Sequence, residues 1–526
     1  MDTKALRQKV LDLAIRGKLV SQDPNDEPAS VLLERIRQQK QQMVKEGKLK
    51  AKDIKNDTII FVGEDNLHYE KFSDGSVKCI EDEIPFDLPD GWAWSKIGPL
   101  CEYITSGSRG WAQYYSETGI LFLRMGNLSR DSFDLRLDNL QRVNLPDNAE
   151  GTRTRVAEND LLFSITAEIG MLGLIPANFE EAYINQHVGL IRFLKDAQTK
   201  FFPYILMSEF CRDQYYTVQC GMKNSFRLDN IQNILAPVPP LGEQIRIAEK
   251  LSNIWTHIQQ IDIESEAASD IISKAKSKIL DLAIRGQLVP QDPDDEPASV
   301  LLERIRAEKE ELIKQGKLKR DKKESVIFRG EDNSYYLRTG ELVESLEDWD
   351  FEELPDSWSV CCLGELCDYG NCTNIDTADI ADSAWILDLE DIEKDSGVVL
   401  QKVRQGERNA GSTKHRFHKG QVLYSKLRPY LNKVVLANED GYCTSEILPL
   451  EFERNILPQY ARYFLMSPAF LRYANKCSYG VKMPRLGTAD GKKAIISVPP
   501  VKEQKRIIMA IELAFAQLAS IAENLA

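Results

Sequence analysis

Apolar and polar positions alternate with helical spacing over one long stretch in the middle of the chain. From Ile247 onward, small or apolar residues recur at steps of four and three, which is the spacing of a coiled-coil seam. Neither Pro nor Gly interrupts the pattern before Gly286. It predicts one helix from about Glu243 to Gly286, roughly 40 residues and about 60 Å long. The seam positions are Leu251, Ile254, Ile258, Ile261, Ser265, Ala268, Ile272, Ala275, Ile279 and Leu282.

The end of this stretch repeats the N-terminus. KVLDLAIRGKLVSQDPNDEPASVLLERIR at 9–37 is nearly identical to KILDLAIRGQLVPQDPDDEPASVLLERIR at 278–306. An internal repeat of this length indicates that the same structural unit occurs twice, whatever the local pattern predicts. Looser matches follow in the GEDN motifs at 63–66 and 330–333 and in LPDGW at 88–92 and LPDSW at 354–358.

A second boundary is also repeated. VPPLGEQIRI at 238–247 resembles VPPVKEQKRI at 498–507. Between the two kinds of boundary lie two segments of similar length, about 93–237 and 359–497, which share little sequence. The repeated segments, here called the frame, are therefore duplicated, whereas the two variable segments between them differ.

The two ends of the chain resemble the two ends of the central helix. Residues 502–526 align with 242–266, and residues 2–15 align with 271–284. Together the fragments amount to about one such helix, so we expect the termini to meet and rebuild a second long helix, antiparallel to the first. That closure would give the monomer a pseudo-two-fold axis; the alternative is a plain tandem duplication without closure. The fragments carry the seam residues Ile507, Ile511, Ala514, Leu518, Ile521 and Leu525 at the C-terminus and Leu6, Val10 and Leu13 at the N-terminus.

The first repeat reads as two helices followed by strands. Gly17 ends the first helix, and QDPNDEPAS supplies a turn with an N-cap at Ser30 for a helix over about 30–46. Gly47 ends that helix. Strand-like pieces follow at 58–72 and, in the second repeat, at 324–338.

Both variable segments read as mixed, β-rich domains, so different sequences are predicted to build the same fold twice. The first has predicted strands at 119–128, 160–175 and 181–194 and a helix at 201–219. The second has predicted strands at 383–392, 421–437 and 441–452 and a helix at 457–477. Each helix is followed by a glycine turn with basic residues, at 220–228 and 479–487.

Composition narrows the class of protein. A length of 526 residues predicts three or four domains, and a net charge of −14 argues against a surface coated for nucleic acid, although local basic patches are compatible with it. Ten cysteines without a secretory leader are typical of a reducing cytoplasm. No uninterrupted apolar run appears long enough to cross a bilayer. We expect a soluble, cytoplasmic protein with no membrane partner.

Two dissimilar domains separated by near-identical helical repeats, each ending in PP-x-x-EQ before a long helix, resemble the specificity subunit of a type I restriction-modification system. The resemblance covers essentially the whole chain. It implies that each variable segment is a target recognition domain for one half of an asymmetric site in double-stranded DNA. It also implies that the helices set the spacing and dock two methyltransferase subunits, which motor-nuclease subunits join. S-adenosylmethionine, ATP and Mg²⁺ would bind those partners, and this chain would bind no cofactor.

The expected fold class is α+β, with two β-rich mixed α/β target recognition domains separated by a pair of long antiparallel coiled-coil helices in pseudo-two-fold symmetry. A rod pair of this kind holds two readers at a fixed distance and helical phase on DNA. The predicted domains are an N-terminal helical region at 1–87, recognition domain 1 at 88–240, a central helical region at 241–353, recognition domain 2 at 354–500, and a C-terminal helix at 501–526.

Base reading needs Arg or Lys for guanine, Asn or Gln for adenine, and carboxylates for the cytosine amino group. Glycine turns that carry Lys and Arg favour phosphate contact instead. Polar residues at strand ends can also simply decorate a surface. The candidates in the first domain are Ser164, Thr166, Asn185, Gln186, His187, Lys223, Asn224 and Arg227. Those in the second are Lys426, Arg428, Tyr430, Asn432, Lys433, Ser445, Glu446, Lys482 and Arg485.

No catalytic or metal-binding pattern stands out. PVPPL and SVPPV lack the Asn and the aromatic residue of an adenine methyltransferase motif, and G-x-x-x-x-G-K-[ST] does not occur. The acidic run DLEDIEK at 388–394 suits a solvated turn better than a nuclease site. Four nearby cysteines match no CxxC spacing and have no histidine beside them, which favours buried or incidental thiols. They are Cys361, Cys362, Cys367 and Cys372.

These patterns together predict a non-catalytic DNA-recognition subunit with no metal site. Two other classes of protein stay open at this stage. One is a coiled-coil scaffold that binds DNA without sequence preference. The other is an enzyme, or a specificity module fused to a methyltransferase or nuclease, that works without type I partners.

Overall fold

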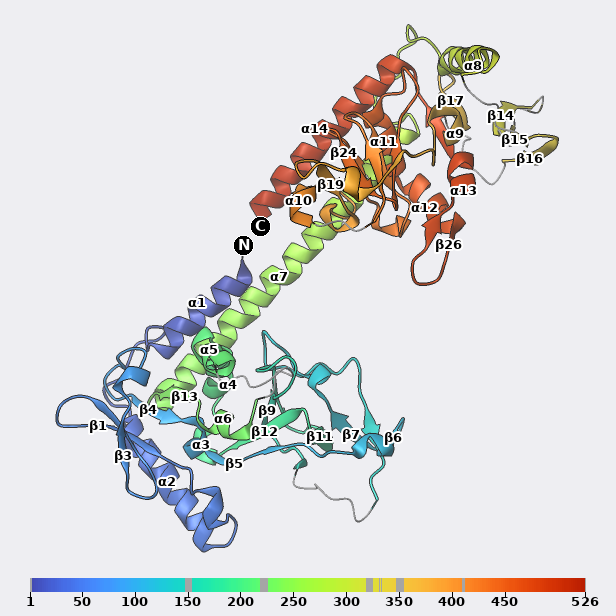
Figure 1. Cartoon of the computed structure of the whole chain (residues 1–526). Coiled ribbons are helices and arrows are strands. Elements are labelled where there is room, and N and C mark those ends of the chain that lie inside the picture. The colour runs from blue at the N-terminus through green and yellow to red at the C-terminus, as the bar shows by residue number, and fades with distance from the viewer. Residues whose placement is uncertain are drawn as a thin grey trace. The chain divides into compact units, whose positions relative to one another are not determined.

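The computed structural model divides the chain into two compact units, Met1–Glu264 and Ser265–Ala526 (Figure 1). The structure describes residues 2–146, 154–217, 226–317, 325–330, 332, 334–346, 354–408 and 412–525. One helix, α7 (Leu241–Ile284), begins in unit 1 and ends in unit 2, without a break over 44 residues. The single central helix that the seam predicts is therefore confirmed.

Unit 1 is a mixed α/β unit. A four-stranded sheet in the order β10-β9-β12-β5 and a second sheet in the order β11-β7-β8-β6 form its variable part. Its helices are α1 (Thr3–Ile15), α2 (Ala29–Lys45), α3 (Ile97–Leu100), α4 (Phe201–Leu206), α5 (Glu209–Thr217) and α6 (Leu228–Gln232). Its strands are β1 (Ile59–Val62), β2 (His68–Lys71), β3 (Val77–Cys79), β4 (Ala93–Lys96), β5 (Cys101–Ser106), β6 (Tyr115–Ser116), β7 (Ile120–Leu123), β8 (Arg142–Val143), β9 (Leu161–Ser164), β10 (Leu172–Leu174), β11 (Ala182–Ile184), β12 (Val188–Phe193) and β13 (Leu235–Val238).

Unit 2 repeats this plan with a different distribution of strands. A three-stranded sheet β23-β22-β25 and a five-stranded sheet β18-β21-β24-β19-β20 replace the two sheets of unit 1. Its helices are α8 (Ala298–Lys314), α9 (Leu363–Leu366), α10 (Gln405–Arg408), α11 (Pro458–Met466), α12 (Pro468–Cys477), α13 (Thr488–Lys493) and α14 (Val501–Leu525). Its strands are β14 (Ser325–Arg329), β15 (Tyr335–Thr339), β16 (Leu342–Ser345), β17 (Ser359–Cys362), β18 (Asn374–Ile375), β19 (Trp385–Leu387), β20 (Val403–Arg404), β21 (Lys414–Phe417), β22 (Val422–Ser425), β23 (Val434–Leu436), β24 (Gly441–Thr444), β25 (Ile447–Leu450), β26 (Ser478–Tyr479), β27 (Arg485–Leu486) and β28 (Ile495–Val498).

Equivalent strands of the two units pair in the same way. In unit 1, β11 runs parallel to β7, with Ile184 opposite Leu123, and β12 is antiparallel to β9. In unit 2, β24 runs parallel to β19, with Cys443 opposite Leu387, and β25 is antiparallel to β22. Two sequences with little in common therefore share these strand pairings, although the sheets differ in strand number and order.

The repeated boundary motifs contact one another within each unit, which explains why they recur together. In unit 1, Nη2 of Arg246 lies 2.6 Å from Oδ2 of Asp26. In unit 2, Nη2 of Arg506 lies 2.7 Å from Oδ2 of Asp295. The buried glutamine of each PP-x-x-EQ motif also donates its side-chain N–H back to a proline carbonyl, Gln244 to Pro239 and Gln504 to Pro499. In each unit the QDP(N/D)DEPAS turn is thereby bound to the start of a long helix, α7 in unit 1 and α14 in unit 2.

The long helix contacts the helices at the two ends of the chain, α1 in unit 1 and α14 in unit 2. Arg7, near the start of α1, pairs with Asp262, whereas Gly17 beyond the end of α1 lies against Trp92, which bonds to Glu243 at the start of α7. In unit 2, the ammonium group of Lys276 lies 5.7 Å from the centre of the Phe515 ring. The hydroxyl of Ser497, just before α14, donates to the carbonyl of Ile284 at the end of α7. Most predicted seam positions of α7 are less exposed than their neighbours, but Ser265 is exposed.

Two predicted helix boundaries differ from the structure. The second helix begins at Ala29 with Pro28 in the N-cap position, not at Ser30, and no side chain caps it. The N–H of Ala29 instead donates to the carbonyl of Gly91 at 2.8 Å, and Ala298 donates to Ser357 in the same way. A backbone carbonyl of the LPD(G/S)W motif thus replaces the serine cap.

The helix predicted at 201–219 is two helices, and so is the helix predicted at 457–477. Each break falls at a buried serine, Ser208 or Ser467, whose hydroxyl accepts a bond from the backbone N–H three residues later. Serine at such a position favours the start of a new helix over continuation of the old one. In unit 2, Pro468 reinforces the break because it has no N–H for the preceding helix.

One helix, α14, meets a length and composition test for crossing a membrane, with a mean hydropathy of 1.4 over its most apolar window. This test allows charged residues within its window, and Glu512 and Glu523 interrupt the apolar sequence of α14, so the expectation about an uninterrupted apolar run is not contradicted. The first turns of α14 lie in the core of unit 2 through Ile507, Ile508 and Ile511. A single helix of this kind is weak evidence for a membrane.

Candidate nucleic-acid interface

In unit 1, two turns at adjacent strand ends bring several predicted residues together. The first follows β9, the second joins β11 to β12, and the N–H of Ile165 donates to the carbonyl of His187 at 3.0 Å across them. Thr166 and His187 are also linked through Oγ1 and Nδ1 at 3.0 Å. Asn185 accepts a bond from the backbone N–H of His187. The predicted strand at 160–175 is thus an antiparallel pair, β9 and β10, whereas the strand at 181–194 is two strands, β11 and β12, in different sheets. The turns within both stretches carry the polar residues.

These turns line a cleft of about 480 Å³. Thr166, Asn185 and His187 form one side of it, as expected from their places at strand ends. Arg124 and Asn139 also line it, although the sequence did not single them out. Arg124 follows the buried strand β7 directly, and a charged residue at the end of a buried strand was a usable signal. Its proximity to the turns depends on the parallel pairing of β7 with β11.

Ser164 holds the first turn in shape. Its side chain is completely buried, its hydroxyl donates to the carbonyl of Glu168, and it accepts a bond from the N–H of Met171 at 2.8 Å. In the same turn Ala167 has φ +57°, a left-handed conformation that costs a non-glycine residue energy. We therefore assign Ser164 to shaping the turn rather than to contacting a ligand.

Of the remaining candidates of unit 1, two are exposed on the surface and two lie in a segment that the structure does not describe. Gln186 is exposed, and its Nε2 lies 3.1 Å from Nε2 of His187. Arg227 is exposed at the N-cap position of α6. Lys223 and Asn224 lie outside the described residues.

The equivalent turn of unit 2 follows β22 and has the same internal bonds. The N–H of Lys426 donates to the carbonyl of Glu446, as Ile165 does to His187. The hydroxyl of Ser425 donates within the turn, as that of Ser164 does. Arg428 has φ +49° at the position that Ala167 occupies in unit 1, and its N–H donates to the carbonyl of Pro484.

Two candidates of unit 2 neutralise each other. The guanidinium of Arg485 forms a bidentate pair with the carboxylate of Glu446, with Nη2 and Oε1 2.9 Å apart. The hydrogen bond that Arg485 donates to this carboxylate raises the pKa of Arg485, so the arginine stays charged. Because both side chains are partly exposed, the pair can present a donor and an acceptor side by side.

The other candidates of unit 2 separate into internal and surface residues. Asn432 donates to the carbonyl of Met466, and Lys433 donates to the carbonyl of Leu389 at 2.7 Å. Burial lowers the pKa of Lys433. Lys426 and Arg428 are half-buried, whereas Tyr430 and Ser445 are exposed. The structure therefore gathers the candidates around one pair of turns but directs some of them inward.

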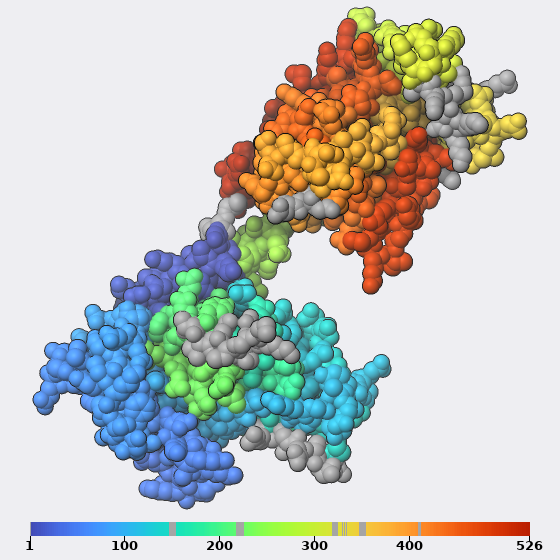
Figure 2. Space-filling view, viewed as in Figure 1, coloured from blue at the N-terminus to red at the C-terminus, as the bar shows by residue number. Residues whose placement is uncertain are grey.

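Lys482 lies at the tip of the β26–β27 hairpin, which projects from the body of unit 2 (Figures 1 and 2). Its neighbour Val481 is fully exposed, and Tyr479 and Met483 are exposed as well. Arg485 lies on β27 of the same hairpin, so the tip is connected directly to the Arg485–Glu446 pair.

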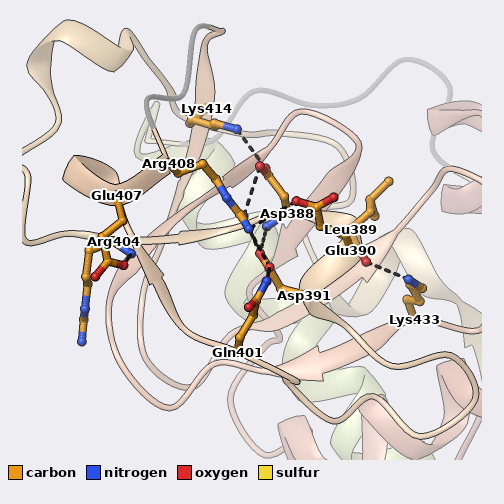
Figure 3. A network of polar contacts seen from close by, with 10 residues as sticks. All are labelled: Asp388, Leu389, Glu390, Asp391, Gln401, Arg404, Glu407, Arg408, Lys414 and Lys433. Atoms are coloured by element: carbon orange, nitrogen blue, oxygen red, sulfur yellow. Dashed lines mark hydrogen bonds and ion pairs between the residues drawn. The ribbon is translucent and has the colours of Figure 1, made fainter. Parts of the chain in front are cut away.

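The acidic run at 388–394 is an ion-pair network rather than a solvated turn (Figure 3). Asp391 is completely buried and accepts bonds from Arg408, with Nη2 and Oδ1 2.7 Å apart, and from the side chain of Gln401. Lys414 donates to Asp388 at 2.9 Å. Burial by itself would raise the pKa of Asp391, but the bonds from Arg408 and from the backbone N–H of Asp388 outweigh it and lower the pKa. These carboxylates are neutralised by the protein's own cations.

The clustered cysteines are largely buried, as expected. Cys361, Cys362 and Cys367 are buried, and Cys372 is half-buried. Burial raises the pKa of each thiol, that of Cys362 to about 12. Among the described residues no group of three potential ligands is arranged to hold a metal ion.

The structure shows two related units with polar turns at equivalent places, and comparison with known proteins identifies the family. The family described as "Type I restriction modification DNA specificity domain" matches residues 89–268 and again 355–520. The chain belongs to this family and contains its domain twice. The resemblance inferred from the sequence is confirmed.

Curated relatives agree with this assignment. The chain is 29% identical over 424 residues to the specificity subunit of the type I restriction enzyme EcoEI of Escherichia coli, covering 69% of this chain and 61% of the relative. It is equally similar to the EcoAI specificity subunit of Escherichia coli, covering 70% and 63%. The chain thus aligns with less than two thirds of the length of these relatives.

A solved structure described under complex assembly and conformational transition of the type I R-M system is similar in fold. It matches 84% of this chain and 94% of its own with a TM-score of 0.51 and 15% sequence identity. At that identity the likeness concerns the fold alone.

Proposed function

We propose that the chain is the non-catalytic DNA-recognition subunit of a type I restriction-modification complex, in which each unit reads one half of a bipartite, asymmetric site. The observation that carries the proposal is the presence of the same specificity domain twice, on matching frames, with different polar residues in equivalent turns. Two different readers on one chain suit an asymmetric target, because a symmetric dimer would bind two equal half-sites.

The polar turns supply the chemistry that base reading requires. Unit 1 offers amide and hydroxyl groups from Thr166, Asn185 and Gln186, and unit 2 offers Lys426, Ser445 and the Arg485–Glu446 pair. Side chains of these types hydrogen-bond to base edges in the major groove. The exposed Lys482 and Arg227 suit phosphate contacts, which give affinity without sequence preference.

The duplicated frame supports two identical protein partners, since the same surface is present once in each unit. By analogy with the family, these are two methyltransferase subunits, joined by motor-nuclease subunits for cleavage. S-adenosylmethionine, ATP and Mg²⁺ belong to those partners in this proposal, and the complex works in the cytoplasm. Because the chain has a net charge of −14, it should bind DNA weakly alone and tightly within the complex.

The long helices act as a spacer in this proposal. Contacts of α7 with α1 and with α14 support an antiparallel arrangement. The seam residues Ile521 and Leu525 at the end of α14 are exposed. Meeting of the two chain ends would cover them and complete a second rod antiparallel to α7. The two readers would then be related by a pseudo-two-fold axis.

A chimaera in which residues 93–237 are replaced by residues 359–497 tests both function and symmetry. It should be co-expressed with the methyltransferase of its own operon, and the methylated sites should be mapped by modification-sensitive sequencing. The native chain should mark a two-part asymmetric motif. The chimaera should mark the unit 2 half-site twice as an inverted repeat.

Each other outcome has a distinct meaning. A direct repeat would show two readers in tandem and would contradict the pseudo-two-fold arrangement. Methylation by the native complex without any two-part motif would contradict DNA recognition by two units. Methyl transfer or cleavage by the purified chain alone would contradict the non-catalytic assignment.

A further inference from the structure

We infer that Arg124 is a specificity-determining residue of unit 1 and that it reads a guanine in the half-site bound by that unit. The inference rests on the proposed DNA-recognition function and identifies one residue and one base. It starts from a contrast between the arginines of unit 1.

The backbone at Arg124 is held rigidly. Its N–H donates to Oδ1 of Asn127 at 2.9 Å, and Asn127 is buried. The amide nitrogen of Asn127 donates in turn to the carbonyls of Arg136 and Asn139. Since Arg124 also follows the buried strand β7, the start of its side chain is fixed beside the cleft.

The guanidinium of Arg124 lacks the carboxylate partner that Arg130, Arg142 and Arg192 have, and it lacks the close backbone carbonyl that Arg136 bonds to in Leu128. Arg130 pairs with Glu168, Arg142 with Glu180, and Arg192 with Asp160, at 2.6 to 2.9 Å. Across the part of the chain that the structure describes, Arg124 forms no such ion pair. Its one side-chain bond, from Nη2 to Oδ1 of Asn139, is 3.5 Å long and therefore weak.

The cleft contains no carboxylate that could neutralise this charge. Besides Arg124, its polar lining consists of Asn127, Asn139, Thr166, Asn185 and His187. A planar cation with several free donors in a neutral, recessed site suits a ligand with two adjacent acceptors. In the major groove guanine offers that pair through O6 and N7, and arginine binds it with two parallel bonds.

In unit 2 the position equivalent to Arg124 carries a charged side chain that is paired within the protein. Asp388 occupies the place of Arg124, at the end of β19, and its N–H donates to Asp391 as that of Arg124 does to Asn127. There the charged side chains are satisfied by Lys414 and Arg408. The equivalent position of unit 2 is therefore used internally, whereas that of unit 1 is available.

The test compares Arg124→Ala and Arg124→Lys with the native chain, each in complex with its methyltransferase. Arg142→Ala is the matched control, because Arg142 lies in the same unit but is neutralised by Glu180. Methylated motifs would be mapped by sequencing. Binding would be measured to duplexes that carry the motif, with each guanine replaced in turn by 7-deazaguanine, which lacks the N7 acceptor.

We expect both Arg124 variants to lose discrimination at one G·C pair of one half-site by about tenfold or more, with the other half-site unchanged. Replacing that guanine by 7-deazaguanine should weaken binding of the native complex but not further weaken that of Arg124→Ala, because the two changes remove the same contact. Arg142→Ala should retain the native motif.

Two results would overturn the inference. The motif could be unchanged in Arg124→Lys while Arg124→Ala loses affinity uniformly, which would show a phosphate contact. Alternatively, no guanine analogue could affect native binding. If Arg124→Ala methylates no site, the analogue series is compared between the native complex and Arg124→Lys, and an equal loss at the same guanine in both would overturn the inference. Absence of a two-part motif for the native complex would contradict the proposed function itself, and that result is visible before any variant is made.

Discussion

The turn at Arg124–Asn127 in unit 1 and the turn at Asp388–Asp391 in unit 2 have the same backbone and opposite electrostatics. In both, the first N–H donates to the side chain three residues later, at 2.9 and 2.8 Å. The unit 1 turn borders an open cleft, whereas the unit 2 turn is the centre of an ion-pair network (Figure 3). The cations of that network come from Arg408 and Lys414, outside the turn. The frame thus fixes where a turn lies, and distant residues decide whether its charges are free.

A second pair of equivalent sites differs in the same way. Each unit has a three-stranded antiparallel sheet beside the strand that follows the LPD(G/S)W motif, β1-β2-β3 in unit 1 and β14-β15-β16 in unit 2. In unit 1, Glu70 is buried and pairs with Lys96 at 2.8 Å. In unit 2, Leu337 occupies the corresponding place and packs in an apolar cluster with Cys362, the counterpart of Lys96. A buried ion pair and an apolar contact therefore perform the same structural task.

The largest expected effect follows from giving unit 2 the residue of unit 1. Asp391→Asn preserves the hydrogen bond to the backbone but removes the charge opposite Arg408, which is only 13% exposed. Breaking a buried pair in this way should lower the free energy of unfolding by about 4 kcal/mol. Urea denaturation would measure it, with Glu390→Gln as the control, because the Glu390 side chain is 76% exposed. A loss below about 1 kcal/mol would show that Asp388 alone suffices for Arg408.

A somewhat smaller effect is expected at the Glu70–Lys96 pair. Glu70→Gln leaves the ammonium group of Lys96 without its carboxylate, and unfolding free energy should fall by about 3 kcal/mol. The double variant Glu70→Leu/Lys96→Cys copies unit 2 and should return to within about 1 kcal/mol of the native chain, because an apolar contact needs no charge compensation. Thermal and urea unfolding would measure both. If the double variant were as unstable as Glu70→Gln, the two sites would not be interchangeable.

The smallest expected effect is a pH dependence shared by the frames. Burial raises the pKa of Glu243 and of Glu503, although bonds from Trp92 and Gln291 oppose it. In the folded state both carboxyl groups therefore stay protonated at pH values above their unfolded pKa of about 4.3. Their contribution to stability is fully present below that pH and is lost as the pH rises through the raised folded pKa. Glu243→Gln and Glu503→Gln should gain stability relative to the native chain over that window, to similar extents.

Asp391 should change the free energy of unfolding with pH in the opposite direction. Because its pKa is lowered, its contribution is present above about pH 3.9 and is lost as the pH falls toward the folded pKa. Unfolding curves at several pH values would separate the two signs. A different response of Glu243→Gln and Glu503→Gln would contradict the equivalence of the two frames.

Local pattern was sufficient for the long helix α7, the duplication and the family. The seam of α7 consists of apolar or small residues spaced four and three apart, and the repeats are recognisable from their nearly identical sequences. Thr166 and His187 were also within reach of sequence reasoning, since polar residues that follow buried strands mark turns. The prediction of one helix in each unit overlooked Ser208 and the Ser467–Pro468 pair, although serine at an N-cap and proline at the first helical position are local signals of a helix start.

Tertiary structure alone decided which charged groups are free. Arg124 lies beside Thr166 and His187 because β7 runs parallel to β11, a pairing between segments roughly 60 residues apart that no local period specifies. Asp391 is neutralised by Arg408 for a similar reason, through contacts between separate segments of unit 2. The sequence by itself determined the repeated frame, since periodicity and repetition are local properties. The open cleft of unit 1 and the closed network of unit 2 depend on which distant side chains the sheets bring together.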